Sequence, residues 1–112
     1  MGTQLRDGNI GRMGMIQVTI DPGSVAANTT AEQTFAVQGL QIGDFVLVSR
    51  PSVGSTPGIS MPNARVSAPN TLALVFGNHT AGAINLTAEV YRLMWFRPEV
   101  GDPAVLPGAV QV

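Results

Sequence analysis

Residues 13–20 read MGMIQVTI, in which the apolar Ile16, Val18 and Ile20 alternate with polar residues. Successive side chains of a β-strand point to opposite faces, so this period of two predicts a half-buried strand. The next four residues, 21–24, read DPGS. They are typical of a turn, because proline fixes one backbone angle and glycine tolerates a positive φ. The strand is therefore expected to end at residue 20.

Working outward from this strand, the sequence repeats the same arrangement of short apolar stretches and turn residues. Strands are predicted at residues 33–37, 45–48, 64–68, 71–76, 83–86 and 89–97. The stretch 45–48 (FVLV) is apolar at every position, which predicts a central strand covered on both faces. Residues 69–70 (PN) predict the turn of a hairpin, and residues 26–32 predict an extended link or at most one helical turn.

No window shows a sustained helical period, so the sequence predicts an all-β fold. We expect a single-domain β-sandwich or small β-barrel of about six short strands over residues 15–97. Residues 51–62 carry three prolines and two glycines and predict a surface loop, with a short extended piece at Ile59.

Both ends of the chain differ from this body. Residues 1–14, with glycines at 2, 8, 11 and 14, predict a flexible N-terminal arm. Residues 98–112 (PEVGDPAVLPGAVQV) predict a proline-rich, extended C-terminal arm. This second segment is too apolar for a typical solvated tail. Two interpretations stay open: a floppy terminus, or an arm that docks on its own domain or on a neighbour, which the branched apolar residues favour.

The composition excludes several classes of partner. Charged residues make up 12% of the 112 positions, about half the usual share, and all six basic residues are arginines. With a net charge of −1, the chain lacks the basic surface that binds nucleic acid. Its apolar runs are far too short to span a bilayer, and no signal pattern opens it. We therefore expect no nucleic acid and no membrane as partners.

The sequence offers little chemistry. Cysteine is absent and His79 is the single histidine, which we interpret as an exposed loop residue. The seven carboxylates are dispersed, so we expect no catalytic residue, no metal site and no cofactor, and the protein is predicted not to be an enzyme. The run Met94-Trp95-Phe96 is interpreted as core or, alternatively, as a stacking platform for bases or sugars.

Two groups of residues carry a resemblance. The first is 21–35 (DPGSVAANTTAEQTF), with Gly39-Leu40, 43–46 (GDFV) and Pro51. The second is 64–67 (ARVS), 70–76 (NTLALVF) and 89–91 (EVY). Together they resemble small virion proteins of tailed bacteriophages, namely head-decoration (cement) proteins or related fibre modules, over roughly residues 15–97. The chain departs from that pattern at Arg50, where lysine is expected, and in the loop at 56–59 (TPGI).

The resemblance implies a virion structural protein rather than an enzyme. It implies a decoration subunit that is assembled in the host cytoplasm, binds the major capsid protein on the capsid surface and stabilises the shell, and we expect a homotrimer. The residues expected at the capsid or subunit interface are the loop 52–61 and Arg6, Arg12, Arg97, Val100, Val105, Leu106 and Val110. The alternative is a tail- or head-fibre module that binds a host-surface glycan through Trp95, Tyr91 or the His79 loop.

Overall fold

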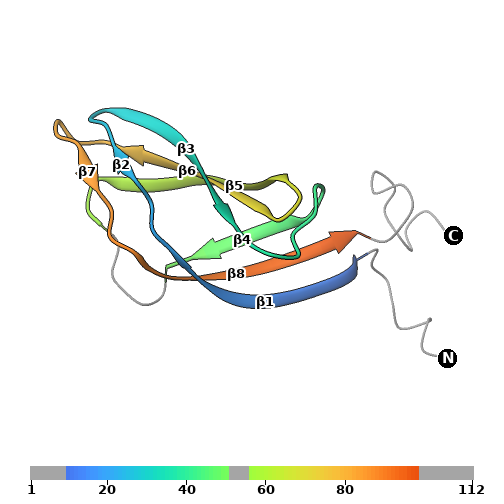
Figure 1. Ribbon diagram of the computed structural model, residues 1–112. Coiled ribbons are helices and arrows are strands. Elements are labelled where there is room, and N and C mark those ends of the chain that lie inside the picture. The colour runs from blue at the N-terminus through green and yellow to red at the C-terminus, as the bar shows by residue number, and fades with distance from the viewer. Residues whose placement is uncertain (1–9, 51–55, 99–112) are drawn as a thin grey trace, which may run out of the picture.

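The computed structural model describes residues 10–50 and 56–98, and every regular element in them is a β-strand (Figure 1). The all-β fold predicted from the sequence is confirmed. The eight strands are β1 (Ile10–Ile20), β2 (Ser24–Val25), β3 (Thr29–Ala36), β4 (Phe45–Ser49), β5 (Ile59–Ala68), β6 (Thr71–Asn78), β7 (Ile84–Asn85) and β8 (Glu89–Pro98).

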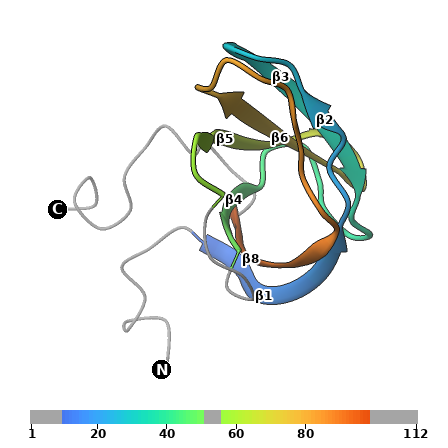
Figure 2. The same cartoon turned by 90° about the vertical axis from the view of Figure 1, so that its left-hand side faces the viewer.

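The strands form three antiparallel sheets. Two sheets have three strands each, in the orders β1-β8-β4 and β3-β6-β5, and β2 pairs with β7 in a short ribbon. The two larger sheets lie one above the other in the end-on view of Figure 2. Both contribute to one buried core, whose fully covered side chains include Ile20, Leu72, Leu74, Phe76, Tyr91 and Leu93.

The strand at the centre of the first sheet is β8, and β4 lies at its edge. The prediction that residues 45–48 form a central strand covered on both faces is therefore wrong. Val46 and Val48 point toward the core, whereas Phe45 and Leu47 are 59% and 51% exposed. An apolar run on both faces can mean either burial or an exposed apolar surface, and the sequence pattern does not distinguish them.

Two strands begin earlier than expected. β1 begins at Ile10, so residues 10–14 of the expected flexible arm are paired with the end of β8. Gly14 lies close to the Trp95 ring, and a Cβ atom at this position would lie 3.1 Å from Nε1 of Trp95, so that the ring would have to shift. β3 likewise begins at Thr29 and not at residue 33, since its whole length pairs with β6. The segment expected as a link or helical turn is therefore mostly strand.

The hairpin predicted around residues 69–70 is confirmed, because β5 and β6 pair directly on either side of it. Asn70 adopts a positive φ of 61° at the turn, and its side-chain oxygen accepts a hydrogen bond of 2.7 Å from the Gly39 amide. β5 begins at Ile59, so the end of the expected loop 51–62 is strand. Residues 51–55 lie outside the described part of the chain.

Candidate binding face

The outer face of the β1-β8-β4 sheet carries two apolar rows. Residues on this face alternate with core residues along each strand, so the pairing register places them side by side. Phe96 of β8 lies between its partners Met13 of β1 and Phe45 of β4. The next row is Met94 between Met15 and Leu47. We call these six side chains the apolar face: Met13, Met15, Phe45, Leu47, Met94 and Phe96.

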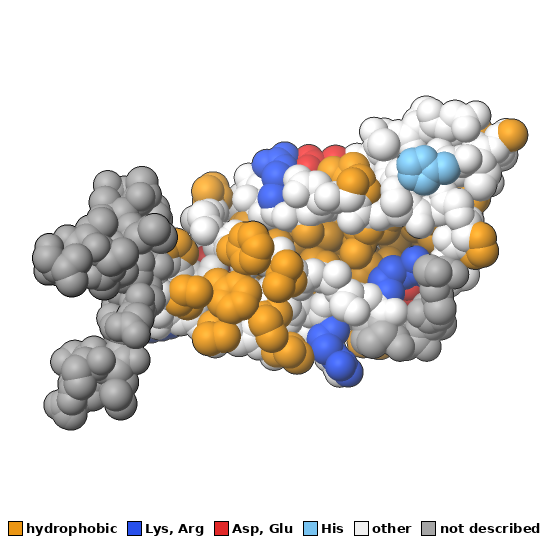
Figure 3. Space-filling model, turned by 180° about the vertical axis from the view of Figure 1, so that it is seen from behind, with side chains coloured by type: hydrophobic (Ala, Val, Ile, Leu, Met, Phe, Trp, Pro, Cys, Tyr) orange, Lys and Arg blue, Asp and Glu red, His pale blue; other side chains and the backbone are white. Residues whose placement is uncertain are grey.

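The apolar face is largely open to solvent. Met13 is 60% exposed and Met15 is 55% exposed, and Phe45 and Leu47 on the opposite edge are similarly open. These four side chains expose on the order of 400 Å² of apolar surface, a size at which a patch on a monomer is often functional. Figure 3 shows hydrophobic side chains gathered toward the end of the molecule where β1 begins and β8 ends.

The apolar face has a sharp boundary. One row further along the same three strands, Arg92 lies between Gln17 and Ser49, and all three are polar. Within the apolar face itself the rings of Phe45 and Phe96 lie with their centroids 5.9 Å apart, in a tilted arrangement. The sheet therefore presents a continuous uncharged surface two rows deep, which ends at a row containing an arginine.

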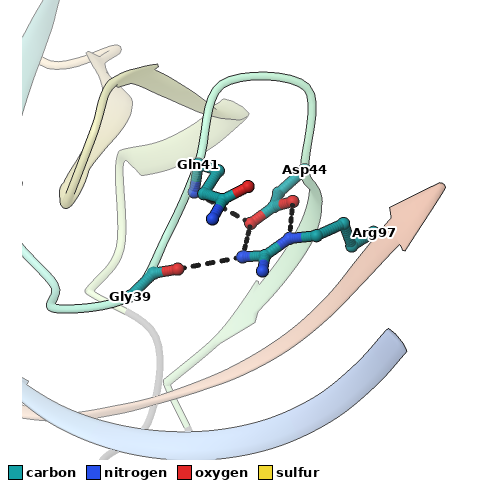
Figure 4. A network of polar contacts seen from close by, with 4 residues as sticks. All are labelled: Gly39, Gln41, Asp44 and Arg97. Carbon is teal, nitrogen blue, oxygen red and sulfur yellow. Dashed lines mark hydrogen bonds and ion pairs between the residues drawn. The ribbon is translucent and has the colours of Figure 1, made fainter. Parts of the chain in front are cut away.

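An ion pair on the other side of β8 holds this end of the sheet in place (Figure 4). The Arg97 guanidinium donates to both carboxylate oxygens of Asp44, at 2.8 and 2.9 Å, and to the Gly39 carbonyl at 2.9 Å. The Gln41 amide donates to the same carboxylate at 2.9 Å. The Asp44 side chain is only 1% exposed, and its pair with Arg97 ties the turn before β4 to the C-terminal end of β8.

The electrostatics of this ion pair follow from its hydrogen bonds. The bonds from Arg97 hold the pKa of Asp44 below its ordinary value, against the opposing effect of burial. The guanidinium also lies 5.1 Å from the ring centroid of Trp95, in a cation–π contact. Arg97, expected at a capsid or subunit interface, is thus engaged within its own chain.

A second buried ion pair lies at the other end of β8. Glu89 accepts a hydrogen bond from Nε of Arg50, and the Glu89 side chain is 5% exposed. The Arg50 guanidinium lies 5.7 Å from the ring centroid of Tyr91. Burial raises the pKa of the fully covered Tyr91. Both ion pairs therefore position β8 and β4 and present no reactive group to solvent.

The remaining expected sites are placed as follows. Arg12 is exposed near the start of β1, and His79 is exposed as predicted, with its Nε2 2.8 Å from Oγ of Ser60. His79 lines an open hollow of about 530 Å³ together with polar side chains, among them Thr29 and Thr30. Tyr91, a candidate for glycan binding, is buried, and Trp95 is half-buried beneath Arg97. Arg6, Val100, Val105, Leu106 and Val110 lie outside the described residues.

Sequence reasoning missed the apolar face as a site. Its signal was present, because residues 45–48 and 89–97 carry bulky apolar groups on both faces while only one face can contact the core. The strand order decides which face is left open, and that order depends on pairing between residues distant in sequence.

Over residues 10–50 and 56–98, no group of three or more His, Asp or Glu side chains is placed to hold a metal ion. The same part of the chain contains no helix long and apolar enough to cross a membrane. No family model, curated protein or solved structure matches the chain.

Proposed function

We propose that this protein is a structural subunit of a bacteriophage virion, a decoration protein that binds the major capsid protein and stabilises the shell as a homotrimer. The observation that carries the proposal is the apolar face. A subunit that stays free in solution rarely exposes a continuous apolar patch rimmed by polar residues, because such a patch drives association. The sequence resemblance to decoration proteins is the reason for proposing a capsid as the assembly that this subunit joins.

The electrostatics of the body support the same function. In the described chain, Arg50, Arg65 and Arg97 are each paired with a carboxylate of the same chain. A subunit with a low density of uncompensated charge is suited to contacts that are buried permanently, since burying an unpaired charge is costly. The proposed location is the capsid surface, after assembly in the host cytoplasm.

The test is binding to empty shells assembled from the major capsid protein of the phage that encodes this chain. We expect the wild-type protein to sediment with the shells and to raise their temperature of disassembly. Phe45→Glu places a charge in the apolar face and should abolish both effects. Thr19→Glu is the matched control, because Thr19 is exposed on the same strand face beyond the polar row. Wild-type protein that stays in the supernatant at micromolar concentrations contradicts the proposal.

The second candidate is a fibre module that binds a host-surface glycan, and the hollow beside His79 favours it. That hollow is open and lined by hydroxyl, amide and imidazole groups, which hydrogen-bond sugars. The aromatic residues expected for such a site do not line it. Titration of host polysaccharide against a His79→Ala variant and the wild type distinguishes the two functions, because a decoration subunit shows no saturable binding.

A further inference from the structure

The apolar face is shaped to receive an extended segment. It is three strands wide and two rows long, so its side chains start from an area of about 10 Å across the strands and about 7 Å along them. Its residues are long and adaptable on the β1 edge, where Met13 and Met15 lie, and bulkier on the β4 edge. A single extended chain laid across such a surface can bury alternate side chains between the rows.

The chain itself supplies a segment with complementary composition. Residues 99–112 (EVGDPAVLPGAVQV) contain four valines, one leucine and two alanines, together with two acids and no basic residue. The apolar face is bordered by one basic group, Arg92, which lies in the row beyond it between Gln17 and Ser49. Apolar residues against the rows and an acid against Arg92 give a match in both hydrophobicity and charge.

The position of this segment in the chain favours a neighbouring copy as the acceptor. Pro98 ends β8 only two residues beyond Phe96, so a segment covering its own face would have to reverse direction at once. The prolines at positions 103 and 107 favour extended polyproline geometry for this segment. In polyproline geometry the fourteen residues reach about 43 Å. This length exceeds that of a ten-residue strand, so the segment is long enough to reach the face of a neighbouring copy.

We propose that residues 99–112 of one copy lie across the apolar face of the next copy. The donor segment and the acceptor face are different surfaces, so the contact is head-to-tail, the kind of contact that forms a ring when the rotation between copies closes. This inference deepens the proposed function and rests on it for the ring being a trimer. Shell binding then requires the assembled ring, so Phe45→Glu, which blocks formation of the ring, also abolishes binding to the shell.

The test compares the full chain with the chain truncated after residue 98, by sedimentation and by peroxide oxidation of methionine. The full chain should be a trimer with slow oxidation of Met13 and Met15. The truncated chain should be monomeric and should oxidise at those two positions several-fold faster, with Met61 of β5 as the internal reference because it lies off the apolar face. A synthetic peptide of residues 99–112 should restore the slow rate.

A second variant guards against misfolding of the truncated chain. The full-length Leu106→Asp chain keeps the whole body intact and should also dissociate, whereas Gln111→Asp adds the same charge at a polar position and should remain a trimer. A truncated chain that stays trimeric overturns the inference, and so does a monomeric full chain whose methionines are protected, since its segment then covers its own face. Neither result depends on shell binding, so failure here is distinct from failure of the proposed function.

Discussion

The sharpest consequence of an interface at the apolar face concerns Leu47, which lies in its second row. Leu47 is 51% exposed, so covering it completely adds about half of the 1.5–3 kcal/mol that a fully buried leucine contributes, or about 1 kcal/mol. Leu47→Glu loses that contribution and also requires the removal of a carboxylate from water, a penalty of several kcal/mol if it stays ionised. A total loss of binding free energy near 3 kcal/mol predicts that the dissociation constant of the subunit assembly rises about a hundredfold.

The variant should weaken assembly without weakening the fold. Because the Leu47 side chain points outward, the free energy of unfolding of the monomer should change by no more than about 1 kcal/mol, the span of strand preferences. Sedimentation across a dilution series measures the dissociation constant, and urea unfolding measures stability. Thr19→Glu is the control for added charge. Equal dissociation constants for the two variants, or a loss of stability large enough to unfold Leu47→Glu, would refute the reasoning.

Three further predictions concern the body. Asn78→Ala removes a side chain that is 1% exposed and makes four hydrogen bonds, among them one to the Val25 carbonyl; we expect a loss of about 3 kcal/mol in urea unfolding. The lowered pKa of Asp44 stabilises the fold; this stabilisation is fully present above the ordinary aspartate pKa near 3.9 and is lost as pH falls through the lower pKa of the folded state. Asp44→Asn should therefore make the free energy of unfolding less dependent on pH over that range. Gly14→Val should displace Trp95, seen as a red shift in its fluorescence that Gly23→Val does not produce.

The elements of this fold were accessible from sequence where local chemistry decides them. Alternation identified the strand that ends at Ile20, and the Pro69-Asn70 turn identified the β5–β6 hairpin, because both signals are contained within a few residues. Boundaries were less accessible. The start of β1 at Ile10 depends on β8 continuing to Pro98 beside it, and no local signal in a glycine-rich stretch reports a distant partner.

The ion pairs that position β8 and β4 could not be predicted from the sequence, for the same reason. Asp44 accepts a hydrogen bond from the Gln41 amide at the turn before β4, but its ion pair joins it to a residue 53 positions away. Glu89 begins β8 and is buried against Arg50, 39 positions away. Pairings of this kind depend on the order of strands in the sheet, which alternation alone does not give.

The low charge of the whole chain does not explain the apolar face. If a scarcity of charged residues were the cause, apolar and polar side chains would be mixed over the outer surface of the sheet. They are instead separated up to one row: β1, β8 and β4 all change from apolar to polar where Arg92 lies between Gln17 and Ser49. A boundary shared by three strands that are distant in sequence is the arrangement expected where a partner covers the apolar side of it. The position of the boundary is therefore an argument for a partner, and it predicts that charge is tolerated on one side of that row and not on the other.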